Sequence, residues 1–112
     1  MKLIIKASAE DDMLRQTDWY EQQGLSAIAD RFTAAVFAAI NAAIKTPKAG
    51  APRPVANSAL AGLRTWPVKG FDEFRIYYVI RGDVFMVVRV LHGRRDIDAI
   101  VETQAIDDPD AD

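Results

Sequence analysis

Four arginines and the only histidine of the chain are the side chains whose chemistry suits a phosphate group. A guanidinium group stabilises negative charge on phosphate oxygens, and an imidazole can act as a general base. The residues are Arg64, Arg89, His92, Arg94 and Arg95. A lone histidine before a glycine at a strand end is also a common structural hydrogen-bonding residue. We therefore treat all five as candidates for contact with a target and name no catalytic residue.

The charge of the chain is unevenly distributed along the sequence. The 112 residues carry a net charge of −2, but residues 31–95 contain eleven Lys or Arg and three acidic residues, a net charge of +8. Such a basic block is typical of a protein that meets a polyanion or an acidic partner. The alternative is a solvated surface whose acidic neighbours, from elsewhere in the chain, lie close in space.

Several kinds of site have no residues to build them. No cysteine is present, which removes disulfides, cysteine-ligated zinc and a thiol nucleophile. No pair of acids has the context of an acid/base dyad, and the sequence has no phosphate loop or dinucleotide-binding motif. We expect no metal and no cofactor. The apolar run of residues 3–5 is too short for a signal peptide. We expect that no stretch approaches the length of a membrane span and that the protein is cytoplasmic.

Two helices should follow a short first strand at residues 2–6. Ser8 is a predicted N-cap for a helix that ends near Gln23, with Glu10, Asp11 and Asp12 in its first turn. Ser26 is a predicted N-cap for a second helix that ends near Lys45. The apolar row of this second helix repeats every four residues: Ile28, Phe32, Val36, Ile40 and Ile44. Because the break between the helices is short, they should form a hairpin that covers one face of a sheet.

The second half of the chain is typical of strands. After a loop at 46–59, strands are predicted at 63–68, 74–81 and 84–92, with a tight turn at Gly82-Asp83. Alternation should place residues 84, 86, 88 and 90 on one face of the last strand and residues 85, 87, 89 and 91 on the other. A short helix should follow. The predicted fold is α+β: an N-terminal strand, a helical hairpin, an antiparallel three-stranded meander and a short C-terminal helix. Residues 1–106 should form one domain, with an acidic disordered tail at 107–112.

Three stretches, in order along the chain, carry a family pattern. The first is the N-terminal strand with its acidic helix and Trp19-Tyr20. The second is residues 60–68 (LAGLRTWPV), followed by Phe71 and residues 74–78 (FRIYY). The third and most specific is residues 88–97 (VRVLHGRRDI). Together they resemble the ParE-type toxins of the RelE/ParE toxin–antitoxin superfamily, over roughly residues 2–101.

The resemblance implies a toxin with the RelE-like fold, neutralised by a ParD-type antitoxin. ParE-type toxins are known as inhibitors of DNA gyrase that trap the enzyme on cleaved DNA, and contact with DNA otherwise comes through the antitoxin complex. RelE relatives are instead ribosome-dependent ribonucleases, which commonly place a Tyr or His near the C-terminus. No Tyr or His follows His92. The leading hypothesis is therefore a non-enzymatic gyrase inhibitor. The alternatives are an mRNA endoribonuclease and a non-toxic antitoxin-binding relative.

Aromatic residues outside the main apolar row are the candidates for binding the antitoxin. Trp19 and Tyr20 adjoin on the first helix, Phe37 lies off the apolar row of the second helix, and Tyr77 falls in a predicted central strand. Exposed aromatic side chains suit a protein interface, although each of these could equally pack in the core.

Overall fold

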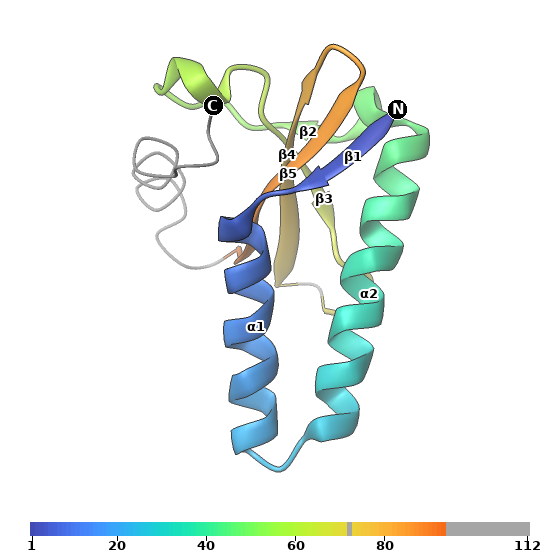
Figure 1. Cartoon of the computed structure of the whole chain (residues 1–112), viewed down its shortest axis with the longest axis vertical. Helices are drawn as coiled ribbons and strands as arrows, with labels where there is room; N and C mark the ends of the chain where they lie inside the picture. The colour runs from blue at the N-terminus through green and yellow to red at the C-terminus, as the bar shows by residue number, and fades with distance from the viewer. Residues whose placement is uncertain (72, 94–112) are drawn as a thin grey trace.

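The computed structural model describes residues 1–71 and 73–93, and Figure 1 shows the arrangement of their elements. The elements are β1 (Lys2–Ile5), α1 (Ala7–Gln22), α2 (Ser26–Lys45), β2 (Ala51–Pro52), β3 (Arg64–Pro67), β4 (Phe74–Arg81) and β5 (Val84–His92), with 3₁₀ turns at Pro47–Ala49 and Ser58–Leu60. The predicted α+β order is confirmed. The predicted C-terminal helix and acidic tail lie outside the described residues.

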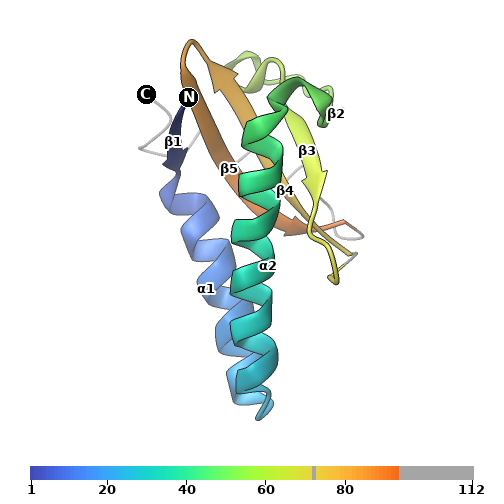
Figure 2. The ribbon, with the colours of Figure 1, turned by 90° about the vertical axis from the view of Figure 1, so that its right-hand side faces the viewer.

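One five-stranded sheet supports the helices, in the order β1-β5-β4-β3-β2. The β2–β3, β3–β4 and β4–β5 pairs are antiparallel, whereas β1 pairs with β5 in parallel. A two-residue turn joins β4 to β5, and Gly82 adopts a φ of 57° there. The helical hairpin covers one face of the sheet, and its tip extends past the sheet at the lower end of Figure 2.

The main core lies between the hairpin and the sheet. Phe32, Val36 and Ile40 of the predicted α2 row are fully buried. They pack with Tyr78 of β4 and Phe85 of β5 in one cluster. Each large apolar side chain buried in this way stabilises the fold by about 1.5–3 kcal/mol. The helical period of α2 and the alternation of β4 therefore meet in one apolar layer, as predicted.

The opposite face of the sheet has a smaller cluster. Leu60 and Leu63, from the segment before β3, pack against Tyr77 and Val79 of β4 and Val88 of β5. The loop predicted at 46–59 is more ordered than expected, because it contains β2 and a 3₁₀ turn. This segment covers part of the second face.

A β-bulge changes the predicted alternation of β5. Tyr77 pairs with Arg89 and Tyr78 pairs with Val87, so that Val88 has no partner on β4. Residues 85, 87 and 90 contribute to the main core, and residues 86, 88 and 91 to the smaller cluster. The predicted faces of residues 90 and 91 are therefore wrong. The extra residue at the bulge reverses the sides that follow it.

Neither predicted N-cap serine caps its helix. Lys6 occupies the N-cap position of α1 and Leu25 that of α2, and neither makes a side-chain capping hydrogen bond. The chain passes from β1 into α1 without a turn, so Ser8 already lies inside the helix. The Lys6 carbonyl oxygen accepts hydrogen bonds from the N–H groups of Ala9 and Glu10. The predictions of Ser8 and Ser26 as N-cap residues are therefore wrong.

The expectation of no stretch long enough for a membrane span is also wrong. Over the described residues, α2 is the one helix with the length and composition to cross a membrane, at 20 residues and a mean hydropathy of 1.4. However, the apolar row of α2 packs into the main core. A buried core helix passes the same test of length and hydropathy.

The loop after α2 is fixed to the sheet by Tyr78. Its hydroxyl donates a hydrogen bond to the Pro47 carbonyl oxygen at 2.7 Å, and Nη1 of Arg64 donates to the Gly50 carbonyl oxygen at 2.7 Å. Burial raises the pKa of Tyr78 above its ordinary value of 10.0, against the opposing charge of Arg64. A Cβ atom at Gly50 would overlap the Tyr78 hydroxyl. Only glycine lets the loop approach the tyrosine this closely.

We predict that Gly50→Ala destabilises the protein by about 1–3 kcal/mol, because the added methyl overpacks the site. Tyr78→Phe alone should cost about 1 kcal/mol, the value of one hydrogen bond. Urea unfolding of both single variants and the double variant is the measurement. In the double variant the loss of unfolding free energy should be smaller than the sum of the two single losses. The added methyl then no longer overlaps a hydroxyl group. Strict additivity would contradict this account of Gly50.

Candidate functional site

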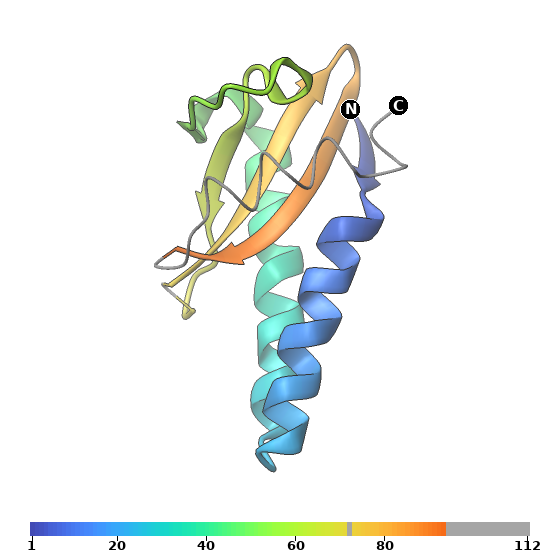
Figure 3. The same cartoon turned by 90° about the vertical axis from the view of Figure 1, so that its left-hand side faces the viewer.

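The seam between α1 and β5 positions the functional surfaces. β1 pairs with β5 only as far as Ile5 and Val87. Beyond that point α1 replaces the strand, as Figure 3 shows where β1 leads directly into the helix. The Ser8 hydroxyl donates to the Val88 carbonyl oxygen at 2.7 Å, and a carboxylate oxygen of Asp12 accepts from the Val90 N–H at 2.9 Å. Side chains of α1 thus satisfy backbone groups that β1 no longer reaches.

Asp12 also holds the guanidinium group of Arg89. Nε of Arg89 lies 2.7 Å from Oδ2 of Asp12, and Nη2 lies 2.8 Å from Oδ1. The two side chains are only 3% (Asp12) and 8% (Arg89) exposed. Arg15 lies at the solvent side, with Nη1 3.6 Å from Oδ1 of Asp12. This bidentate geometry satisfies both carboxylate oxygens inside the fold.

The position of Arg89 bears on its predicted role. We expected Arg89 to be a candidate for contact with a target, and the structure instead places its guanidinium group in the α1–β5 seam. Sequence reasoning missed Asp12 as its partner, because the two residues are 77 positions apart. Asp12 was counted only among the acids of the first helical turn. It is the bulge and the end of β1 that bring the two together.

We predict that Asp12→Asn lowers the free energy of unfolding by about 3–5 kcal/mol, because it leaves the Arg89 charge buried without its counter-ion. The matched control is Asp18→Asn, which changes an exposed carboxylate of the same helix. The control should stay within about 0.5 kcal/mol of the parent. Urea or thermal unfolding measures both. Equal stability of the two variants would mean that the seam contributes little.

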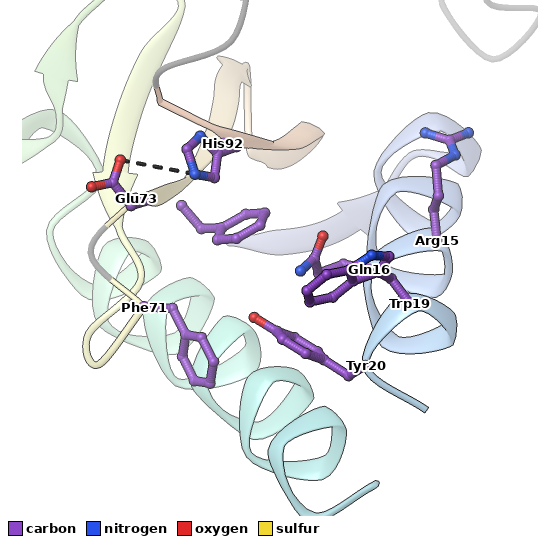
Figure 4. A pocket seen from close by; sticks show the side chains of 8 residues that line it. Arg15, Gln16, Trp19, Tyr20, Phe71, Glu73 and His92 are labelled. Atoms are coloured by element: carbon purple, nitrogen blue, oxygen red, sulfur yellow. Dashed lines mark ion pairs between the residues drawn. The ribbon is translucent and has the colours of Figure 1, made fainter. Parts of the chain in front are cut away.

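An aromatic pocket of about 540 Å³ opens between α1 and the segment before β4 (Figure 4). This cavity is here called the aromatic pocket. It is lined by Arg15, Gln16, Trp19, Tyr20, Phe71, Glu73, Phe74 and His92. Rings meet edge to face: the Phe74 and His92 rings have centroids 5.2 Å apart, and those of Trp19 and Tyr20 are 5.4 Å apart. Aromatic side chains therefore form much of the wall.

The aromatic pocket joins residues that the sequence had assigned to different roles. Trp19 and Tyr20 were antitoxin-binding candidates, and His92 was a target-binding candidate. Trp19 is 52% exposed, whereas Tyr20 and His92 are half-buried. Nε2 of His92 lies 3.9 Å from Oε2 of Glu73. Sequence reasoning missed Glu73, because nothing in the pattern placed the end of β5 beside the turn before β4.

A second, apolar groove crosses the outer side of the hairpin. It has a volume of about 210 Å³ and is lined by Ile5, Glu10, Met13, Leu14, Thr17, Thr33 and Phe37. Leu14 is 60% exposed and Phe37 is 44% exposed. The structure thus presents Phe37 on a surface, as an antitoxin-binding candidate requires. Sequence reasoning missed Leu14, because its place beside Phe37 depends on how the two helices pack.

The remaining candidates lie elsewhere. The Tyr77 ring is buried in the smaller cluster on the second face of the sheet. Arg64 is half-buried beside Gly50. Arg94 and Arg95 lie outside the described residues. Within residues 1–71 and 73–93, no group of three or more His, Asp or Glu side chains is placed to hold a metal ion.

Comparison with known protein families identifies the family of this chain. The family model described as "ParE toxin of type II toxin-antitoxin system, parDE" matches residues 3–97, which is most of the chain. The chain belongs to the ParE toxin family. The resemblance seen in the three sequence stretches is confirmed, and membership of a toxin–antitoxin family implies a cognate antitoxin partner. No curated protein is similar enough to this ParE-family chain to count as a relative.

Two solved structures share the fold of this ParE-family chain. A chain of the chromosomal ParDE TA system from P. aeruginosa superposes with a TM-score of 0.68 at 18% identity, covering 82% of this chain and 95% of that one. A YoeB/ParE toxin from Agrobacterium tumefaciens gives a TM-score of 0.54 at 22% identity, covering 82% and 98%. At these identities the likeness concerns the fold, and it confirms the expected α+β architecture.

Proposed function

We propose that this ParE-family toxin is a non-enzymatic inhibitor of DNA gyrase, kept inactive in the cytoplasm by a ParD-type antitoxin. The family match over residues 3–97 supports the proposal. The observation that favours an inhibitor over a ribonuclease is the Asp12–Arg89 pair, because a phosphate-cleaving site needs accessible cations. Arg64 likewise donates to a backbone carbonyl. Their guanidinium groups stabilise the fold.

The purified toxin should trap gyrase on cleaved plasmid DNA in the presence of ATP, with loss of supercoiling activity. Added antitoxin should suppress the cleaved complexes, because it sequesters the toxin. The measurement is gel analysis of plasmid topology and double-strand breaks. Unchanged gyrase activity at a large molar excess of toxin would reject the proposal. Cleavage of mRNA on translating ribosomes would then support the ribonuclease alternative, and stable antitoxin binding without either activity would support a non-toxic relative.

The apolar groove of the hairpin is the proposed docking surface for the antitoxin. Leu14 and Phe37 expose apolar area on facing helices, and Met13 and Ile5 form the floor between them. Such a groove fits the apolar face of an amphipathic helix, which places its side chains at every third or fourth position. The cognate antitoxin that the family implies is the partner that would cover this area.

We predict that Phe37→Asp weakens antitoxin binding at least tenfold, because a central aromatic contact is worth about 2 kcal/mol or more. Leu25→Asp is the matched control, since Leu25 is an exposed leucine at the hairpin tip and does not line the groove. Calorimetric titration of each variant with the antitoxin gives the affinities, and circular dichroism checks folding. If both variants bind like the parent, the antitoxin docks elsewhere.

A further inference from the structure

The aromatic pocket has the composition of a site for a cation. Trp19, Tyr20, Phe71 and Phe74 bring four aromatic rings to one space. The face of an aromatic ring carries partial negative charge and attracts guanidinium or ammonium groups within about 6 Å. Among these four rings, the indole of Trp19 is the type that attracts cations most strongly. Trp19 is also the most exposed of the four, at 52%. A long side chain could therefore enter beside it.

Glu73 and the end of α1 bring negative charge to the same space. The carboxylate-bearing side chain of Glu73 lines one side of it, opposite Trp19 in the view of Figure 4. The last turn of α1 contains no basic residue, so the partial negative charge at the C-terminal end of the helix is not offset by its own side chains. Both features favour a positively charged occupant.

Two lining residues carry or can carry positive charge, and both have acidic neighbours. Nη1 of Arg15 lies 3.6 Å from Asp12, and in Figure 4 its guanidinium group extends away from the rings. His92 lies 3.9 Å from Glu73 and packs its ring against Phe74. Neither occupies the space between Trp19, Tyr20 and Phe71. An incoming cation would share Glu73 with His92.

We propose that the aromatic pocket binds an arginine side chain presented by a partner protein. A guanidinium group is planar, so that it can stack on an aromatic face and pair with both oxygens of a carboxylate at once. Lysine offers only a point charge, and a nucleotide phosphate would be repelled by Glu73. The inference holds whether or not gyrase is the target, and the site is separate from the apolar groove proposed for the antitoxin.

The test is a titration of the whole chain with the peptide acetyl-Gly-Arg-Gly-amide. Binding is monitored by the NMR signal of the Trp19 indole N–H. The matched probe replaces arginine by citrulline, which has nearly the same shape but no charge. We expect saturable binding of the arginine peptide, at least about tenfold tighter than the citrulline peptide, a difference of about 1.4 kcal/mol. Trp19→Leu identifies the indole signal by its loss, and calorimetric titration of this variant with the arginine peptide should show weaker binding.

Glu73→Gln should reduce the affinity for the arginine peptide to that for the citrulline peptide. Glu10→Gln is the control, because it removes a carboxylate of α1 that lines the apolar groove. Equal affinity for the two peptides, an unchanged arginine affinity in Glu73→Gln, or binding of thymidine monophosphate in place of the arginine peptide would each overturn the proposal. The absence of any saturable shift would do the same. Because neither gyrase nor antitoxin is present, the result is independent of the proposed function.

Discussion

The carboxylate of Asp12 closes the edge of β5 at the point where β1 stops. It accepts hydrogen bonds from the Val90 N–H and from Nε and Nη2 of Arg89, and it is almost fully buried. Without this group, an amide of a central strand and a guanidinium charge would both face an apolar helix interface. A buried charge without a partner costs several kcal/mol, so the position of α1 on the sheet depends on this contact. The aromatic pocket and the apolar groove both use residues of α1, and both inherit that position.

Different parts of α1 have different tasks as a result. Ser8 and Asp12 face the seam with β5, and Trp19, seven residues after Asp12 on the same side of the helix, lines the pocket. Met13 and Leu14 line the groove on another side of the helix. Because the hairpin tip extends past the sheet, the last turns of α1 have no strand opposite them (Figure 2). The segment before β4 lies there instead, and the aromatic pocket forms between the two.

Local patterns in the sequence predicted most of the fold. The four-residue row of α2, the alternation of β4 and the Gly82-Asp83 turn each express a period or a backbone preference that neighbouring residues decide. The parallel β1–β5 pair and the Asp12–Arg89 contact depend on residues about 80 positions apart. The bulge at Val88 depends on the register between β4 and β5, and no local pattern encodes any of the three. The same reason explains the site. Trp19, Tyr20 and Phe37 were found by their type, whereas Glu73 and Leu14 could be found only from their neighbours in space.

The parallel pairing of β1 with β5 sets the order of events during synthesis. β1 and α1 leave the ribosome first, yet the strand that pairs with β1 and accepts Ser8 and Asp12 is residues 84–92. The hairpin α1–α2 can form early from local contacts, but its seam with the sheet must wait for β5. Contacts between such distant residues slow folding, because a long loop is closed before the contact is gained. The aromatic pocket and the apolar groove therefore reach their final geometry only after β5 has been made.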